Sequence, residues 1–230
     1  MNNPAYIFKT EPYAHQKKAL DKSCDSKEFA LFMEMGTGKS KVLIDNVTYL
    51  FVKNKINGVL IIAPKGVYRN WVEREIPYHL PDFIDINMML WKPHVTKQVE
   101  KEKEKLLNDS DSKLNILVMN VEALSTSKGV KFAYAFLSKY KTLMSVDEST
   151  TIKNPTAKRT KNIVSLGKYA YYRRILTGSP VTRSPLDVYT QSQFLDPALL
   201  GFSSFYSFRA RYALLAPGFA GGRSFKKVVG

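Results

Sequence analysis

The sequence predicts an α/β fold, namely a doubly wound, mostly parallel sheet flanked by helices. Short apolar runs rich in branched residues recur along the chain, without the strict polar alternation of a strand that has one wet face. Longer segments with helical periodicity separate these runs, as expected of parallel strands joined by helical crossovers. With 230 residues the chain is long enough for one large domain of this kind.

Five apolar runs are predicted to be buried strands, and a sixth run is a further candidate. The five lie at residues 29–33, 59–63, 115–119, 143–146 and 174–177, and the sixth lies at residues 84–90. Helices are predicted at residues 12–23, 39–53, 95–108, 130–140 and 156–166. This alternation of strands and helices predicts helices on both faces of the sheet.

The chain changes character from Gly201 onward. The aromatic residues there recur at helical spacing, which is typical of packing residues, and a glycine-rich basic end follows them. They are Phe202, Phe205, Phe208 and Tyr212. We therefore expect one domain over residues 1–200, and over residues 201–230 the start of a linker or insertion that leads toward another domain.

The composition narrows the class of partner. Lys and Arg number 35 against 20 Asp and Glu, a net charge of +15 that attracts polyanions and predicts a nucleic-acid partner. A lysine-rich surface without a binding role is the alternative. Cys24 is the single cysteine, so no internal disulfide can form, and we expect a reducing, cytoplasmic setting. The longest apolar runs are too short to span a bilayer, so we expect no membrane partner.

Residues 34–40 read EMGTGKS and stand between a predicted strand and a predicted helix, the setting of a phosphate-binding loop. Glycines allow backbone N–H groups to turn toward phosphate oxygens, and the helix N-terminus adds a favourable dipole. Lys39 would reach the β- and γ-phosphates, and the Ser40 hydroxyl would bind Mg²⁺. Met33 stands where the usual motif has its first glycine, and a chance match is the alternative.

An acidic pair, Asp147 and Glu148, directly follows a predicted strand. The carboxyl ends of parallel strands meet at one edge of the sheet, so we expect this pair beside the phosphate loop. There Asp147 can hold Mg²⁺, and Glu148 can orient and deprotonate the attacking water. For an isolated Asp-Glu pair the alternative is a helix N-cap.

Taken in order, the motifs resemble those of superfamily 2 helicases and translocases, in the chromatin-remodeller (Swi/Snf-like) branch. EMGTGKS is similar to DEMGLGKT, with Met33 at the first acid, and DESTTIKN at residues 147–154 is similar to DEAHRIKN. LTGSP at residues 176–180 resembles LTGTP, and FLDP at residues 194–197 resembles the FLxP that follows it. PYAHQ at residues 12–16 is similar to the motif whose glutamine reads adenine. Ala63–Pro64 with Asn70–Trp71 resembles the first DNA-contacting motif, and NVEAL at residues 120–124 the next.

The resemblance implies a RecA-like P-loop NTPase domain, the first of two in a helicase-type motor, over residues 1–200. It implies ATP and Mg²⁺ as ligands, with Gln16 holding adenine and Ser40 and Asp147 holding the metal. The ATP-binding residues that it implies are Gln16, Gly36, Thr37, Gly38, Lys39 and Ser40, and the catalytic ones are Lys39, Asp147 and Glu148. Thr177, Gly178 and Ser179 would couple the nucleotide state to the grip on DNA.

The resemblance also implies partners. Motors of this kind hydrolyse ATP between two RecA-like domains, the second supplying an arginine finger. The stretch after Pro197 is too short for that domain, so we expect a second domain in cis or in trans and a weakly active isolated chain. Double-stranded DNA is the expected track. The basic residues beside the coupling motifs, which would contact its phosphates, are Lys65, Arg69, Lys153 and Arg183.

One departure and two alternatives stay open at this stage. Thr150 replaces the histidine that commonly links the acidic motif to the Thr-Gly-Ser segment, which leaves a hydroxyl for that link. The chain could instead be a nucleotide-gated DNA-binding module without catalysis of its own. A P-loop kinase or other small-molecule NTPase is a further alternative, although it explains neither the later motifs nor the charge.

Overall fold

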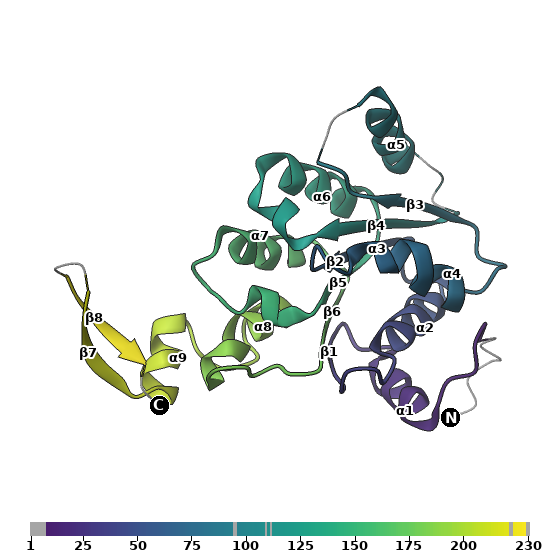
Figure 1. The fold of residues 1–230 in the computed structure, drawn as a ribbon. Coiled ribbons are helices and arrows are strands. Elements are labelled where there is room, and N and C mark those ends of the chain that lie inside the picture. The colour runs from purple at the N-terminus through teal and green to yellow at the C-terminus, as the bar shows by residue number, and fades with distance from the viewer. Residues whose placement is uncertain (1–7, 94–95, 109, 111, 221–222, 229–230) are drawn as a thin grey trace.

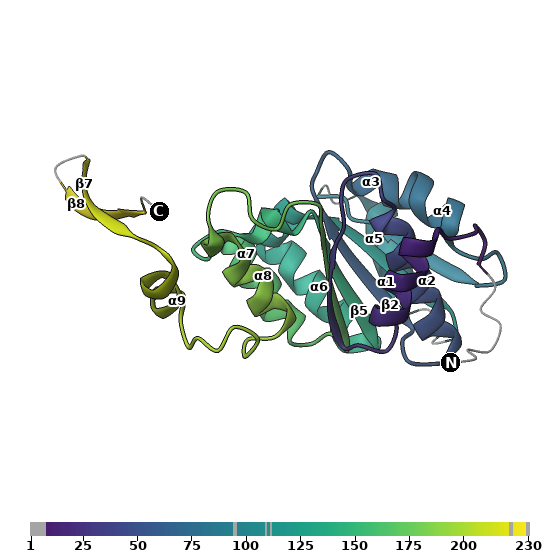
Figure 2. The ribbon, with the colours of Figure 1, turned by 90° about the horizontal axis from the view of Figure 1, so that it is seen from below.

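The computed structural model describes residues 8–93, 96–108, 110, 112–220 and 223–228 of the chain. It confirms the predicted fold class, because a six-stranded, wholly parallel sheet is covered by helices on both faces (Figures 1 and 2). The strands are β1 (Glu28–Phe32), β2 (Gly58–Ala63), β3 (Ile86–Leu90), β4 (Leu114–Asn120), β5 (Thr142–Asp147) and β6 (Tyr172–Thr177).

The strand order is β1-β6-β5-β2-β4-β3. The late strand β6 therefore lies between β1 and β5, and it aligns Thr177 with Phe32 on one side and Leu176 with Asp147 on the other. Consequently the loops that leave β1, β5 and β6 stand next to one another at the carboxyl edge of the sheet.

The two faces of the sheet carry separate cores. Val59 and Ile61 of β2 point into one core, and their neighbours Leu60 and Ile62 point into the other, since side chains alternate along a strand. The first core packs under α1 (Ala14–Ser23), α2 (Lys39–Val52) and a bent helix made of α3 (Tyr68–Asn70), a π-turn (Trp71–Glu75) and α4 (Ile76–His79). The second packs under α5 (Lys97–Asn108), α6 (Ser127–Lys139), α7 (Lys158–Gly167) and α8 (Val188–Leu195). Three 3₁₀ turns complete this part of the chain, at Val121–Ser125, Ser149–Ile152 and Pro185–Asp187.

The predicted strands are confirmed to within three residues at each end, and the sixth candidate is the edge strand β3. Helix boundaries differ more. The helix predicted from residue 12 begins at Ala14, because Pro12 and Tyr13 are extended before it. The helix predicted from residue 130 begins at Ser127, since the Thr126 side chain accepts a hydrogen bond from the Gly129 N–H and caps it. The start predicted at residue 95 lies outside the described residues.

Beyond the sheet, α9 (Phe205–Tyr212) leads into an antiparallel hairpin of β7 (Leu215–Ala220) and β8 (Arg223–Val228). The hairpin projects away from the body of the domain (Figure 1). As their spacing indicates, the aromatic residues here are packing residues: the Phe208 ring lies 5.3 Å from that of Tyr189 on α8, 5.2 Å from Phe202 and 4.8 Å from Tyr212. Within the described part of the chain no helix is long and apolar enough to cross a bilayer.

Candidate nucleotide-binding site

The phosphate loop connects β1 to α2 and turns on two glycines in the left-handed region. Gly36 has φ 76° and Gly38 has φ 83°, values that other residues adopt only at a cost. Gly38 also faces a close neighbour, because a Cβ there would lie 2.2 Å from Gln16 Nε2. The sequence therefore needs glycine at both positions, and at Gly38 it needs the missing side chain as well.

Gln16 ties the start of α1 to this loop. Its side chain is buried, with Nε2 donating to the Thr37 carbonyl oxygen at 3.0 Å and Oε1 accepting from the Tyr13 N–H at 2.9 Å. His15 Nε2 lies 3.0 Å from the same Thr37 oxygen. The residue expected to hold adenine thus stands beside the phosphate loop and stabilises it; its contact with a base stays a prediction.

Most of the predicted phosphate and acidic residues line one cavity of about 360 Å³. At its mouth the Lys39 ammonium donates to the carbonyl oxygens of Met33 and Glu34, each at 3.1 Å. The lining residues are Met35, Gly36, Gly38, Lys39, Ser40, Val67, Asn70, Trp71, Glu75, Asp147 and Glu148. The cavity therefore brings together a cation, turned backbone and two carboxylates from segments far apart in the sequence.

Asp147 is the last residue of β5, and two donors hold its carboxylate. Trp71 Nε1–H donates to Oδ2 at 3.0 Å, and the Glu148 N–H donates to Oδ1 at 2.9 Å. Burial raises the pKa of Asp147, and the charge of Glu148 raises it further, while the hydrogen bond from Trp71 opposes the shift. A cation placed here would favour the ionised form.

The donor set fits a divalent cation that shares its ligands with a nucleotide. Asp147 and Ser40 supply a carboxylate and a hydroxyl, the hard oxygen ligands that Mg²⁺ prefers. Among the described residues no group of three or more His, Cys, Asp or Glu side chains forms a metal site. A magnesium ion here would therefore complete its shell with oxygens from phosphate and water.

Trp71 has a different place from the one its motif indicated. The sequence grouped Asn70 and Trp71 with a DNA-contacting motif, but Trp71 is buried on the π-turn and contacts Asp147, while Asn70 lines the same cavity. Glu75, four residues after Trp71, lines it too. Sequence reasoning missed these contributions to the candidate nucleotide site, because Trp71 and Glu75 lie on a π-turn that departs from the regular helical period.

The predicted coupling segment touches both halves of the site. Glu148 has a left-handed backbone (φ 46°), and its Oε2 lies 3.5 Å from the Thr177 hydroxyl, which also accepts the Ser179 N–H at 3.2 Å. Gly178 lies against the phosphate loop, since a Cβ on it would be 3.3 Å from the Met35 nitrogen. Thr177 thus contacts the acidic pair and Gly178 the phosphate loop, while Ser179 is bonded to Thr177.

A second link joins the acidic turn to the segment after β6, and it uses a different hydroxyl from that of Thr150. Ser149 Oγ donates to Gln191 Oε1 at 2.6 Å, and Gln191 Nε2 donates to the Pro180 carbonyl oxygen at 2.8 Å. The sequence pattern pointed to Thr150 because it aligns with a histidine. Neither Ser149 nor Gln191 stood out in the sequence.

The four basic residues all follow strands at the carboxyl edge, but they are not equivalent. Lys65 and Arg69, after β2, and Arg183, after β6, are exposed. Lys153, after β5, is half-buried, with its Nζ 3.5 Å from Asp187 Oδ2 and hydrogen-bonded to the Thr182 hydroxyl. Lys153 therefore holds the neighbouring loop in place, whereas the other three are available to an external polyanion.

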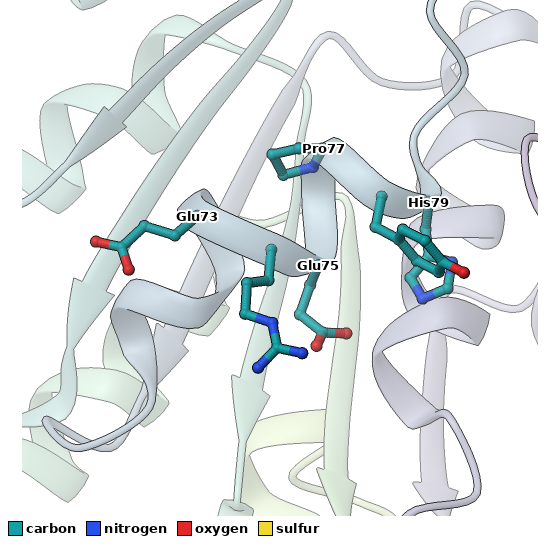
Figure 3. A pocket seen from close by; sticks show the side chains of 6 residues that line it. Glu73, Glu75, Pro77 and His79 are labelled. Carbon is teal, nitrogen blue, oxygen red and sulfur yellow. The ribbon is translucent and has the colours of Figure 1, made fainter.

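A further cavity of about 400 Å³ runs along the bent helix and shares Glu75 with the first. Figure 3 shows Glu73 and His79 toward opposite ends of this helix, with Glu75 between them. The other lining residues are Arg74, Pro77 and Tyr78. An aromatic ring, a guanidinium and an imidazole thus line a cavity that meets the first at Glu75.

A parallel sheet with a glycine-containing phosphate loop after β1 and an acidic pair after β5 defines a P-loop domain of the RecA-like class. The family follows from comparison: the SNF2-related domain matches residues 15–214. The chain belongs to the SNF2-related family.

Relatives agree with this assignment, and a solved structure shares the fold. The chain is 30% identical over 177 residues to the SWI/SNF chromatin-remodeling complex subunit snf22 of Schizosaccharomyces pombe, covering 76% of this chain and 10% of that protein. It is 29% identical over 182 residues to the probable ATP-dependent DNA helicase CHR23 of Arabidopsis thaliana, covering 76% and 15%. The chain thus spans only a small part of these relatives. The fold matches the Sulfolobus solfataricus SWI2/SNF2 ATPase core in complex with dsDNA, with TM-score 0.69 and 22% identity over 89% of this chain and 39% of that one.

Proposed function

We propose that the chain is the ATP-binding half of a DNA-dependent ATPase that translocates along double-stranded DNA. ATP would be hydrolysed to ADP and phosphate when a second RecA-like domain completes the site. The observation that carries the proposal is one cavity lined by Lys39, Asp147 and Glu148. The Thr177 hydroxyl lies 3.5 Å from the carboxylate of Glu148. The SNF2-related relatives include proteins named as chromatin-remodelling subunits and as DNA helicases, which supports the choice of partner.

Each residue has a role that follows from its chemistry. Lys39 and the backbone N–H groups of the loop would hold the β- and γ-phosphates, since both present positive charge to the same space. Ser40 and Asp147 would hold Mg²⁺, which supplies charge neutralisation at the phosphates. Glu148 would orient a water molecule and accept its proton.

The second cavity supports a place for the nucleoside. It adjoins the phosphate cavity through Glu75, and it offers Tyr78 and Arg74, whose planar groups can stack on a purine. Tyr78 is two-thirds exposed, at 66%, and its ring makes a T-shaped contact with His79 at 4.8 Å, so a base would stack on the exposed part of the ring. Gln16 would hold adenine only after giving up one of its present hydrogen bonds.

The carboxyl edge supports the DNA track. Lys65, Arg69 and Arg183 are exposed there, so we propose that they contact phosphates irrespective of sequence. Lys153 would affect DNA binding indirectly, by holding the loop that carries Arg183.

Because the chain covers a small part of its named relatives, the second domain, supplied in cis or in trans through residues 201–230, is part of the proposal. A cytoplasmic setting likewise stays a prediction.

The test of the ATP site is nucleotide affinity. Calorimetry with Mg·ADP should show at least a tenfold loss, about 1.4 kcal/mol, on Lys39→Ala, because that ammonium faces the phosphates. Lys55→Ala is the matched control, since Lys55 is exposed just before β2 at the opposite edge. Equal affinity in the wild type and Lys39→Ala would overturn the proposed site.

The test of the DNA track is the salt dependence of duplex binding. Log affinity should fall with log salt by about 0.9 for each phosphate neutralised. Lys65→Ala or Arg69→Ala should flatten that slope by about one unit, with Lys55→Ala as control. Duplex affinity that does not change with salt concentration would rule out binding through the DNA phosphates.

The rate of ATP turnover with and without DNA then separates the three classes of protein. The turnover of a motor is stimulated by DNA, that of a nucleotide-gated binding module is not, and a kinase needs an acceptor.

A further inference from the structure

Gln191 is a buried amide that bridges two loops of the site. It lies on α8 with 1% of its surface exposed, and every part of its amide is engaged. Oε1 accepts from Ser149 Oγ at 2.6 Å, and Nε2 donates to the carbonyl oxygens of Pro180 and Asp187, each at 2.8 Å. Since an amide nitrogen carries two N–H donors, both are used, and the side chain has one defined orientation.

Asp187, one helical turn earlier, fixes the far end of the same loop. Its Oδ2 accepts from the Thr182 N–H at 2.9 Å, the Thr182 hydroxyl at 2.7 Å and the Arg183 N–H at 2.9 Å. Burial alone would raise the pKa of Asp187, but these hydrogen bonds and the charge of Lys153 outweigh it and lower the pKa below its usual range. The loop from Pro180 to Arg183 is therefore held at one end by Gln191 of α8 and at the other by Asp187 of the 3₁₀ turn that precedes α8.

Three links join the acidic turn to the loop after β6: Glu148 to Thr177, Ser149 through Gln191 to Pro180, and the half-buried Lys153 to Thr182 and Asp187. The Glu148–Thr177 contact is long, at 3.5 Å, while the Ser149–Gln191–Pro180 path consists of short hydrogen bonds to a buried side chain. Breaking a buried hydrogen bond leaves an unsatisfied polar group, which costs about 1–3 kcal/mol. A displacement of the acidic turn is therefore passed to Pro180 and on to the exposed Arg183.

We propose that Gln191 is the positioning residue that couples the nucleotide site to the DNA-facing loop at residues 180–183, with Ser149 as its input. This takes the place that the sequence pattern gave to Thr150. The inference rests on the proposed function, because it needs a ligand at each end. Gln191 itself contacts neither ligand.

The experiment measures the coupling between the two ligands. The affinity of a labelled duplex is measured by fluorescence anisotropy with and without saturating Mg·ADP, and the ratio of the two dissociation constants is the coupling factor. We expect a factor of about five or more in the wild type, within the usual range for coupled sites. Gln191→Leu should bring it close to one, while the affinity for each ligand alone stays within about twofold.

Companion variants separate a relay from a loss of structure. Ser149→Ala leaves both donor bonds of Gln191 in place, yet it should abolish the coupling equally, and the double variant should add nothing. Gln193→Leu is the matched control on the same helix, because among the described residues the Gln193 side chain bonds to the Pro197 carbonyl oxygen and not to the acidic turn or the loop at 180–183, so this variant should keep the wild-type factor. Coupling that survives in Ser149→Ala, or a wild-type factor of one despite binding of both ligands, overturns the relay. Failure of the wild type to bind Mg·ADP or duplex sinks the proposed function instead.

Discussion

Replacing Gly38 by alanine should cost more stability than the same change at Gly36, although both glycines lie in the phosphate loop with similar backbone angles, φ 83° and φ 76°. An L-residue in the left-handed region costs about 1–2 kcal/mol, and this term applies to both positions. A Cβ on Gly36 meets nothing within 4 Å, so Gly36→Ala should lower the free energy of unfolding by that amount alone.

Gly38→Ala carries a second cost. The new Cβ would lie 2.2 Å from Gln16 Nε2, so the Gln16 side chain must move and give up its 3.0 Å hydrogen bond to Thr37. A buried hydrogen bond contributes about 0.5–1.5 kcal/mol, which brings the total for Gly38→Ala to about 1.5–3.5 kcal/mol. In a Gln16→Ala background the clash is absent, and the cost of Gly38→Ala should fall to that of Gly36→Ala.

Urea unfolding of the wild type, the three single variants and the double variant, followed by circular dichroism, measures these differences. The coupling free energy between residues 16 and 38 should be about 1 kcal/mol. Equal costs for the two alanines, or a Gly38→Ala cost that is the same with and without the Gln16 side chain, would refute the close approach as the reason for glycine at this position.

Three further predictions concern other parts of the molecule. Trp71→Phe removes the donor that opposes the raised pKa of Asp147, so the affinity for Mg·ADP, titrated by calorimetry, should weaken at least threefold and more at pH 6 than at pH 8. Arg174→Lys should cost about 3 kcal/mol in urea unfolding, because a buried guanidinium with five hydrogen bonds becomes an ammonium with three donors at most; a loss below 1 kcal/mol would contradict this. Burial lowers the pKa of His79 to about 4, below the 6.5 of an unfolded chain, so the unfolded state binds more protons between these values. Thermal stability should therefore fall as the pH drops from 6.5 to 4, by at most about 3 kcal/mol, and His79→Gln should flatten the profile.

The sequence predicted the sheet and the phosphate loop because their signals are local. A run of apolar residues predicts a strand without any knowledge of the strand that it pairs with. The phosphate loop is recognisable because its glycines and its lysine lie within a few positions of one another. Asp147 and Glu148 were placed correctly because they end a strand, and parallel strands end at one edge.

What the sequence could not predict depends on contacts between distant positions. Trp71 meets Asp147 across 76 positions, and Ser149 meets Gln191 across 42, so no spacing rule connects them. The bent helix was missed because a π-turn shifts the apolar period away from the helical one and Pro77 interrupts the pattern. Lys153 was grouped with free cations because its counter-ion, Asp187, lies on a turn that only the fold brings near.

The position of β6 in the sheet has a consequence for how the molecule is made. Among the strands that the structure describes, β1 pairs with β6 alone, so the strand that carries the phosphate loop lacks this neighbour until residues 172–177 have been synthesised. Closing so long a stretch of chain is slow and lowers the folding rate. A nascent chain on the ribosome would leave β1 without β6 until then. A proteolytic fragment that ends before Tyr172 would keep every residue of the phosphate loop but would lack β6, the strand with which β1 pairs.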